Sequence, residues 1–250
     1  MRALILSSFV AADEIGGQVQ QQALARRGWR TALVPTVLFG RSPAKAGRGL
    51  PMPADHFSAM LEDVAAEGWL QADLVLTGHF SLPEQVEAAA EALRRAPPKL
   101  LVVDPILGDA PRGLYVRPEA AAALEALLLP LADWITPNAW ELSHLTGLEV
   151  ADLAQARHAA RQLEPPALVT SAPLGEGETG LICCEEAGDT LIAHPRLAQA
   201  PNGTGDLVAA VFGAALAEGL PPAEAAAEAA RAVLGWLMPS PGALRIEPLA

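Results

Sequence analysis

The sequence predicts an α/β protein of three layers, in which a mostly parallel central sheet is covered by helices on both faces. Short apolar runs alternate with longer segments of helical periodicity, which is typical of repeated βα units. The runs are continuously apolar, as expected for strands that are buried on both faces. Because 51% of the 250 residues are hydrophobic, the chain can form a large core, and we expect one domain over residues 1–250.

The expected elements follow one another along the chain in an alternating order. Strands are expected at residues 3–6, 31–35, 74–77, 100–104, 134–136 and 168–170. Helices are expected at residues 16–27, 54–67, 83–95, 118–129, 139–145, 152–163, 204–218 and 221–237. Two apolar runs around the polar sequence EEAGD, at residues 180–184 and 190–194, predict a β-hairpin. The Gly/Pro-rich residues 40–53 are expected to be irregular, as a loop that covers a substrate or as a solvated surface loop.

Composition and charge argue against several classes of protein. The formal net charge of −12 disfavours a nucleic-acid-binding protein, which needs a positive surface to replace the counterions of phosphates. The most apolar stretch without a charge, residues 207–217, is shorter than the ~20 residues that span a membrane. Cys183 and Cys184 are adjacent and predict neither a disulfide framework nor a CxxC metal site. We therefore expect a cytoplasmic protein with no membrane partner.

The most informative motif is Asn-Gly-Thr-Gly-Asp at residues 202–206, directly before an apolar helix. Gly203 and Gly205 permit a tight turn whose N–H groups meet at one point, and the helix dipole favours an anion there. Asp206 lies in the first helical turn, where it could take a proton from a hydroxyl that attacks a bound phosphoryl group. A purely structural interpretation also fits, in which a side chain caps the helix and Asp206 complements its dipole.

Acidic residues also follow the strand expected at 100–104. Asp104 ends this strand, and Asp109 follows shortly after it. Ligands of parallel α/β proteins bind at the carboxyl ends of the strands, and carboxylates there suit Mg²⁺. A simple turn explains the same sequence.

A third motif joins the strand at 134–136 to the next helix. Thr136 ends the strand, and Asn138 and Glu141 have the spacing of a capping box, which is a sufficient structural explanation. The functional alternative is that Asn138 and Glu141 join Asp104 in ordering Mg²⁺ and its water molecules.

The fourth motif, Thr170-Ser171, lies at the end of the strand expected at 168–170 and could contact a nucleotide phosphate or a monovalent cation. In a parallel sheet, all four motifs would converge on one edge. The sequence has no GxxxxGK[ST] motif and no GxGxxG in its first βα turn, which excludes a P-loop and a simple dinucleotide site.

Together these motifs resemble those of pyridoxal kinases, which belong to the ribokinase-like superfamily of small-molecule kinases. The matching segments occur in the order and spacing of the family: DPILGD at 104–109, LYV at 114–116, PLADWITPNAWELSHLTG at 130–147, VTS at 169–171 and GTGDLVAA at 203–210. The resemblance implies a ribokinase-like fold, a homodimer, and ATP-dependent phosphorylation of the 5′-hydroxymethyl group of pyridoxal or a related B6 vitamer.

The resemblance also implies roles for individual residues. Asp206 is similar to the catalytic base of the family, and Gly203, Thr204 and Gly205 resemble its anion hole for the γ-phosphoryl group. The residues that match positions near ATP are Asp104, Asp109, Tyr115, Asn138, Glu141, Thr170 and Ser171. Those that match positions near Mg²⁺ are Asp104, Asp109, Thr136 and Glu141, and a monovalent cation such as K⁺ is implied near Thr136 and Thr170. For Tyr115, packing on the sheet is an equally good explanation.

The residues expected to bind the acceptor substrate, mostly in the N-terminal half of the chain, match the family less closely. Ser8, Gly16, Ser42, His79 and Asp206 are the expected substrate-binding residues. Of these, His79 stands in place of a stacking tyrosine, where it could stack on a heteroaromatic ring or only pack.

Three further positions in this half differ from the family. Phe9 replaces a histidine, Asp13 a glycine, and Pro43 the terminal threonine of the FSNHT motif. A hydroxymethylpyrimidine kinase and a non-catalytic vitamer-binding protein of the same fold therefore remain as alternatives.

Overall fold

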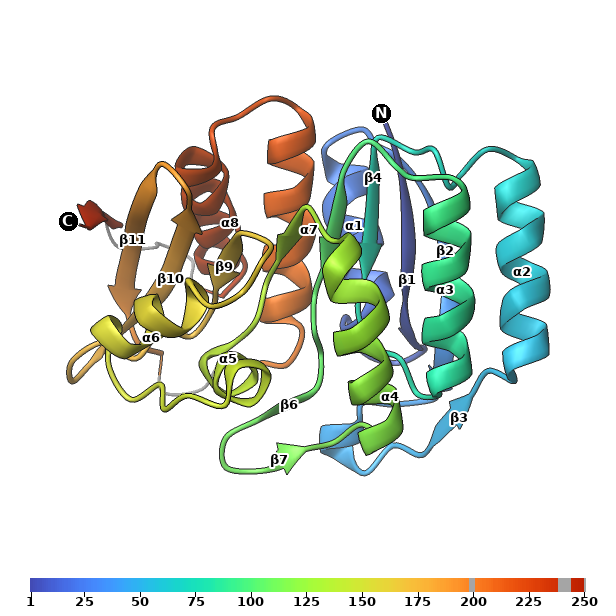
Figure 1. Cartoon of the computed structure of the whole chain (residues 1–250), viewed down its shortest axis with the longest axis horizontal. Coiled ribbons are helices and arrows are strands. Elements are labelled where there is room, and N and C mark those ends of the chain that lie inside the picture. The colour runs from blue at the N-terminus through green and yellow to red at the C-terminus, as the bar shows by residue number, and fades with distance from the viewer. Residues whose placement is uncertain (198–200, 238–243, 250) are drawn as a thin grey trace.

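A ten-stranded sheet runs through the molecule in the computed structural model, which describes residues 1–197, 201–237 and 244–249 (Figure 1). The strand order is β12-β11-β10-β9-β8-β5-β4-β1-β2-β3. The strands from β9 to β2 in this order are paired in parallel, whereas β10, β11, β12 and β3 are antiparallel additions at the two edges. The expected mostly parallel sheet is confirmed.

The strands of this sheet are bounded as follows: β1 Arg2–Val10, β2 Arg30–Phe39, β3 Gly49–Pro51, β4 Leu74–Thr77, β5 Leu101–Val103, β8 Trp134–Ile135, β9 Ala167–Val169, β10 Glu178–Glu185, β11 Gly188–Pro195 and β12 Arg245–Leu249. A separate small hairpin consists of β6 Gly108–Asp109 and β7 Gly113–Leu114. The α-helices are α1 Gly17–Arg26, α2 Ala54–Ala66, α3 Pro83–Arg95, α4 Pro118–Ala123, α5 Ala139–Thr146, α6 Leu153–Ala160, α7 Thr204–Ala217 and α8 Pro222–Leu237.

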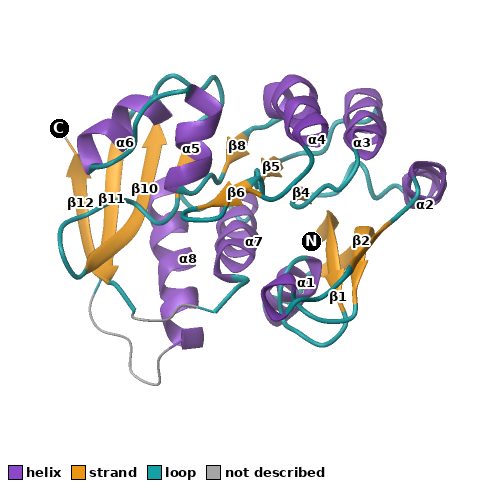
Figure 2. Ribbon diagram, turned by 90° about the horizontal axis from the view of Figure 1, so that it is seen from below, coloured by secondary structure: helices purple, strands orange, loops and turns teal. Residues whose placement is uncertain are grey.

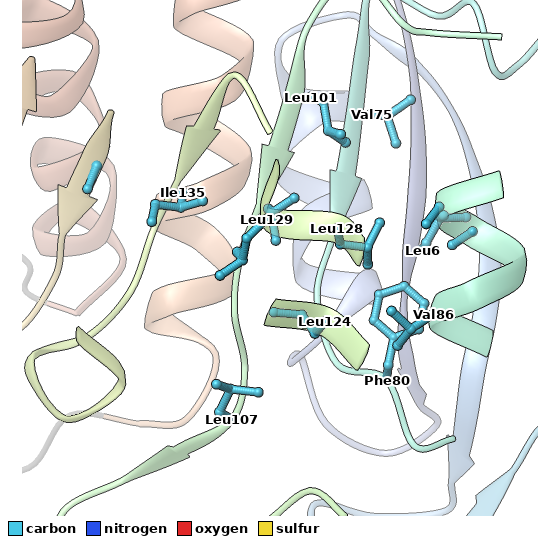
Figure 3. Packing of buried hydrophobic residues seen from close by; sticks show 14 of the residues in the cluster. Leu6, Val75, Phe80, Val86, Leu101, Leu107, Leu124, Leu128, Leu129 and Ile135 are labelled. Carbon is cyan, nitrogen blue, oxygen red and sulfur yellow. The ribbon is translucent and has the colours of Figure 1, made fainter. Parts of the chain in front are cut away.

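Helices cover both faces of the sheet and make the expected three layers. Figure 2 shows α1, α7 and α8 on one face and α2 to α6 on the other. Neighbouring residues of one strand point to opposite faces, so Leu4 and Leu6 of β1 join the core under α2 and α3, whereas Ala3 and Ile5 join the core under α1 and α7. Figure 3 shows part of the first core, in which Phe80 and Val86 lie side by side.

Some elements differ from the sequence prediction. The helix expected at 118–129 is α4 followed by a π-helical turn, Leu124–Leu128, and a 3₁₀ turn, Leu129–Leu131. Pro130 has no N–H to continue an α-helix, which is consistent with the change of helix type there. The region 40–53 is not irregular throughout, because it contains a 3₁₀ turn, Pro43–Lys45, and strand β3.

The parallel arrangement brings the loops after the strands to one edge of the sheet, and α1, α5 and α7 begin at this edge. Over the three described stretches of chain, no helix is both long and apolar enough to cross a bilayer.

Candidate active site

The carboxyl edge of the parallel strands carries the four motifs singled out in the sequence. Figure 2, seen from below Figure 1, views the molecule from the end at which β1 and β4 terminate. The loops after β1, β5, β8 and β9 and the first turns of α5 and α7 supply the residues described next.

Asp206 lies in the first turn of α7 and is 9% exposed. The turn before it depends on Gly203, which has a φ of 93° and whose added Cβ would lie 2.9 Å from the carbonyl oxygen of Glu14. The backbone N–H of Gly16 donates to Asp206 Oδ2 over 2.9 Å. Asp206 Oδ1 is buried and accepts no hydrogen bond from any described residue. One oxygen of the carboxylate is thus held in place, and the other is free to accept a proton.

Three buried carboxyl groups interact with one another at this edge. Burial raises the pKa of Asp206 to about 6, although the Gly16 N–H opposes the rise. Burial also raises the pKa of Asp104 well above its usual value, and the charges of Glu141 and Asp206 raise it further. The neighbouring Thr136 hydroxyl lowers the pKa of Asp104. Thr136 Oγ1 itself forms no hydrogen bond with any described group. The structure therefore brings these motifs close enough for their charges to interact.

Glu141 joins the loop after β5 to the start of α5. Its Oε2 accepts from the N–H of Asn138 over 2.8 Å, and the Asn138 side chain accepts in return from the N–H of Glu141. This is the capping box expected from the sequence. Glu141 Oε1 accepts from the N–H of Leu107 over 3.0 Å and from that of Gly108 over 3.4 Å. Burial raises the pKa of Glu141 to about 8 even though these backbone N–H groups lower it.

Trp140 lies against Gly108, a contact for which the sequence carries no motif. A Cβ added to Gly108 would lie 2.4 Å from the Trp140 ring and 2.4 Å from the carbonyl oxygen of Gly113. The Asn138 side chain also donates to the carbonyl oxygen of Gly108 over 2.9 Å. Gly108 is therefore enclosed by α5 and the β6–β7 hairpin, a contact that a sequence motif alone does not indicate.

Tyr115 follows this hairpin and is 47% exposed. Its N–H donates to the carbonyl oxygen of Leu107 over 3.0 Å, which fixes the backbone while the side chain stays accessible. This exposure argues against the alternative that Tyr115 is packed on the sheet.

Thr170 and Ser171 follow β9 beside Asn138. The N–H of Thr170 donates to the carbonyl oxygen of Pro137 over 2.8 Å, and an isolated parallel bridge joins Asn138 to Thr170. Thr170 is buried, whereas Ser171 is exposed and has a φ of 53°. A positive φ is uncommon for serine and is found most often at turns and functional sites.

The expected metal residues do not form a complete protein cage. In the part of the chain that the structure describes, no three His, Cys, Asp or Glu side chains converge to hold a metal ion. The expectation that Asp104, Asp109, Thr136 and Glu141 hold Mg²⁺ stays a prediction. Both oxygens of Glu141 already accept backbone N–H groups. However, Asp109 Oδ1, Thr136 Oγ1 and Asp206 Oδ1 are buried oxygens without a hydrogen-bond partner among the described residues. Asp109 Oδ1 and Thr136 Oγ1, together with Asp104, fit Mg²⁺, which commonly takes one or two carboxylates with phosphate oxygens and water.

Ser8 and Gly16 lie next to each other at the acceptor end. A Cβ added to Gly16, which has a φ of 63°, would lie 2.2 Å from Ser8 Oγ. Ser8 is 8% exposed. Because the N–H of Gly16 binds Asp206, Ser8 is packed against the residue that orients the candidate base.

The side chains of Ser42 and His79 each form a hydrogen bond with a residue two positions along the chain. Ser42 Oγ accepts from the N–H of Ala44 over 3.2 Å, so this hydroxyl caps its own 3₁₀ turn. His79 Nε2 lies 3.1 Å from Ser81 Oγ, and burial lowers the pKa of the imidazole to about 4. The ring is therefore neutral at pH 7. For neither residue does the structure record a contact with Asp206.

The family model for phosphomethylpyrimidine kinase matches residues 19–242. The chain is 36% identical over 227 residues to a pyridoxine/pyridoxal/pyridoxamine kinase of Bordetella avium, which covers 86% of this chain and 77% of the relative. It is 34% identical over 230 residues to a pyridoxal kinase of Deinococcus radiodurans, which covers 84% and 76%.

A solved structure gives the same result for the fold. The pyridoxal kinase of Entamoeba histolytica superimposes with a TM-score of 0.89 over 99% of both chains at 23% identity. The ribokinase-like fold expected from the sequence is confirmed. This chain belongs to the family of phosphomethylpyrimidine and pyridoxal kinases.

Proposed function

We propose that this protein transfers the γ-phosphoryl group of ATP to the 5′-hydroxymethyl group of pyridoxal or a related B6 vitamer. The observation that carries the proposal is the burial and hydrogen bonding of the Asp206 carboxylate. Its carboxylate is buried at the start of α7, Oδ2 is held by Gly16, and Oδ1 has no partner among the described residues. Kinship to pyridoxal kinases supports the identity of donor and acceptor.

Asp206 acts as the general base in this proposal. The acceptor hydroxyl approaches Oδ1, its oxygen forms a bond to the γ-phosphorus, and the bond from that phosphorus to the bridging oxygen of ADP breaks. The hydroxyl proton passes to Oδ1. A pKa of about 6 keeps Asp206 mostly ionised at pH 7 and makes it more basic than an exposed aspartate.

The first turn of α7 binds the transferred group. The N–H groups of Thr204, Gly205 and Asp206 have no intrahelical acceptor because they open the helix. Together with the helix dipole they attract the oxygens of the phosphoryl group and stabilise the charge that develops during transfer.

The acidic groups prepare the site for the metal and the nucleotide. Asp104, Thr136 and Asp109 would hold Mg²⁺, whose chemistry is to neutralise phosphate charge and orient the γ-phosphoryl group for transfer. Glu141 fixes the backbone of Leu107 and Gly108, and so acts on Asp104 and Asp109 as a positioning residue.

The proposal also assigns residues to the nucleotide, to a monovalent cation and to the acceptor ring. Tyr115, Asn138, Thr170 and Ser171 lie along the ATP side of this edge, and Thr136 and Thr170 are the positions for a monovalent cation such as K⁺. Ser8 and the neutral ring of His79 are the candidate contacts of the acceptor ring. A homodimer and a cytoplasmic location remain predictions.

A second candidate function is the phosphorylation of hydroxymethylpyrimidine. The match of residues 19–242 to the phosphomethylpyrimidine kinase model favours it. His79 is compatible with either ring, because a neutral imidazole can stack on both heterocycles. A vitamer-binding protein without turnover is less favoured, since binding alone gains nothing from a buried, partnerless carboxylate such as Asp206.

A panel of acceptors tests the proposal. ADP formation is measured with ATP and Mg²⁺ in the presence of pyridoxal, pyridoxine or hydroxymethylpyrimidine, with Asp206→Asn as the matched variant. We expect ADP formation that depends on a B6 vitamer and is lost in the variant. Turnover with hydroxymethylpyrimidine alone would replace the first candidate by the second. Vitamer binding without acceptor-dependent ADP formation would identify a binding protein.

A further inference from the structure

Asp13 joins two segments at the acceptor end of the molecule. It lies in the loop between β1 and α1, and its Oδ2 accepts from the N–H of Ser42 over 2.8 Å. Its Oδ1 forms an ion pair with Lys45. Lys45 and this hydrogen bond lower the pKa of Asp13. The Asp13 side chain is 14% exposed and that of Lys45 is 64% exposed, so the contact lies at the surface with the carboxylate on its inner side.

The segment held by Asp13, residues 41–47, is folded tightly on itself. The carbonyl oxygen of Ser42 accepts from the N–H of Lys45 over 2.9 Å and from that of Gly47 over 3.0 Å. A Cβ added to Gly47 would lie 1.8 Å from the carbonyl oxygen of Arg41. The segment is therefore a preformed unit, and a contact at Ser42 fixes all of it.

The loop that carries Asp13 also holds the candidate base. The N–H of Ile15 donates to the carbonyl oxygen of Asp13 over 3.1 Å, and the N–H of the next residue, Gly16, donates to Asp206 over 2.9 Å. A Cβ at Gly203 would lie 2.9 Å from the carbonyl oxygen of Glu14 and 3.2 Å from Ile15 Cα. Residues 14–16 of the loop, directly after Asp13, are thus in contact with the turn at residues 203–206.

A cavity lies beside the contact between Asp13 and segment 41–47. This cavity of about 740 Å³ is lined by Asp13, Ile15, Ser42, Lys45 and Asn202, among others. Asp13 consequently lies between the folded segment 41–47 and the turn that precedes Asp206.

We propose that Asp13 is a positioning residue for the acceptor substrate. It locks segment 41–47 onto the β1–α1 loop and thereby fixes the Gly16 N–H that orients Asp206. This inference rests on the proposed function, because it requires that the acceptor alcohol meet Asp206 at this end. Small displacements of a positioning contact reduce turnover strongly, since the reacting oxygen must stay aligned with the phosphorus.

The chain contains a matched control for a merely structural role. Asp73 also accepts from a backbone N–H, that of Arg2 over 2.8 Å, and its Oδ1 lies 2.6 Å from Lys99 Nζ. The exposed fractions are similar, 20% for the Asp73 side chain and 74% for that of Lys99. This pair, however, lies at the amino edge of the sheet, beyond the start of β4.

Steady-state kinetics of Asp13→Ala, Asp13→Asn, Lys45→Met and Asp73→Ala test the role. For Asp13→Ala we expect KM for the acceptor to rise roughly tenfold and kcat to fall several-fold, with KM for ATP within about twofold. Asp13→Asn keeps an acceptor for the Ser42 N–H, and Lys45→Met keeps the Asp13 carboxylate, so both should show smaller shifts in acceptor KM. Asp73→Ala should leave all three constants unchanged. An unchanged acceptor KM in Asp13→Ala, or an equal change in Asp73→Ala, overturns the inference.

Limited trypsin digestion gives a readout that needs no activity. Arg41, Lys45 and Arg48 are exposed cleavage sites on or beside the segment. We expect cleavage after Arg41 and Arg48, followed by mass spectrometry, to be several-fold faster in Asp13→Ala than in the wild type or Asp73→Ala.

The two readouts separate the inference from the proposed function. If the wild type phosphorylates no acceptor, the proposed function fails, while faster cleavage in Asp13→Ala still supports the lock between the two segments. If cleavage is not faster, the lock itself is refuted, whatever the kinetics show.

Discussion

Buried carboxyl groups at the carboxyl edge of the parallel sheet and carboxyl groups at its amino edge have pKa values that are shifted in opposite directions. At the carboxyl edge, burial raises the pKa values of Asp104, Glu141 and Asp206. At the amino edge, contacts with Lys99 and Arg27 lower the pKa values of Asp73 and Glu218. The difference is a matter of partners, because Asp73 and Glu218 contact cations, whereas the three buried carboxyl groups have backbone N–H groups and one another. Where a carboxylate of the carboxyl edge does contact a cation, as Asp13 contacts Lys45, its pKa is lowered as well.

Hydrogen bonds show the same contrast. Glu218 accepts from Arg27 and from Trp29 Nε1, the latter over 2.8 Å, and Asp133 accepts from the N–H of Leu101 over 2.7 Å. In contrast, Asp206 retains a buried oxygen with no partner in the described chain. An unsatisfied buried polar group lowers stability. The carboxyl edge thus keeps a buried carboxyl oxygen available for a ligand, whereas the carboxylates of the amino edge are used to hold the fold.

The largest effect expected from this contrast is the loss of turnover in Asp206→Asn. Asparagine keeps the size of the side chain but cannot take the hydroxyl proton, so kcat should fall by roughly 10²- to 10⁴-fold. The measurement is steady-state ADP formation. Glu218→Gln, a matched loss of a carboxylate at the amino edge, should keep kcat within about twofold. Comparable turnover by Asp206→Asn would remove Asp206 from the role of base.

The second prediction concerns the stability of the same variant. The pKa of Asp206 rises from 3.8 in the unfolded chain to about 6 in the folded protein, so the folded state binds the proton more tightly. The unfolded chain ionises first, so wild-type stability falls as pH rises from 3.8 to about 6 and then levels off. The total loss is up to about 3 kcal/mol relative to Asp206→Asn at pH 7. Below pH 4 the difference should vanish.

Denaturant unfolding at several pH values, without Mg²⁺ or nucleotide, measures this stability difference. A variant that is less stable than the wild type at pH 7 would show that the buried charge of Asp206 does not destabilise the folded protein.

The third prediction tests the enclosed backbone at the carboxyl edge. Gly108→Ala places a methyl group against the Trp140 ring and the carbonyl oxygen of Gly113, and should destabilise the protein by about 1–3 kcal/mol. Gly235→Ala in α8 is the control, because nothing else lies within 4 Å of the added Cβ in the described structure. It should raise stability slightly, as alanine favours the helix. Thermal unfolding compares the two, and equal stability changes would contradict the enclosure of Gly108.

The smallest expected effect is at the amino edge. Asp73→Asn removes the charge that pairs with Lys99 and should lower stability at pH 7 by ~0.2–1 kcal/mol, because the pair is largely exposed. Since the folded pKa is lowered, this contribution is present above the unfolded value of 3.8 and is lost as pH falls through the folded value. High salt should shrink the difference between variant and wild type in urea unfolding. A salt-independent difference would contradict an ionic origin.

Much of the fold could be predicted from local sequence signals. The predicted bounds of β4 and α3 agree with the structure to the residue, because β4 is a short apolar run and Pro83 opens α3. The strands β3 and β12 were missed. They are short edge strands, and the pairing of β12 is set by a distant part of the chain, since Ile246 pairs with Ile192. The hairpin β6–β7 has only two residues in each strand, too few for a periodic pattern.

The candidate site was predictable to a similar degree. Because parallel strands end at one edge, the proximity of Asp104, Glu141 and Asp206 followed from their positions after strands and before helices. The contact of Asp13 with Ser42 did not follow, since it joins residues 29 positions apart, one in the β1–α1 loop and the other before a short 3₁₀ turn, where no periodic pattern indicates a contact. The packing of Trp140 on Gly108 depends on side-chain shape, which periodicity does not report.

The hydrogen bond from Gly16 to Asp206 joins residues that are 190 positions apart in the chain. A nascent chain that ends after β9 therefore contains Asp104, Asp109 and Glu141 but not the candidate base, Asp206. If Asp206 is the base, as proposed, a nascent or truncated chain that stops before α7 would lack it. Catalytic competence would then arrive late in synthesis, once α7 meets the loop that precedes α1.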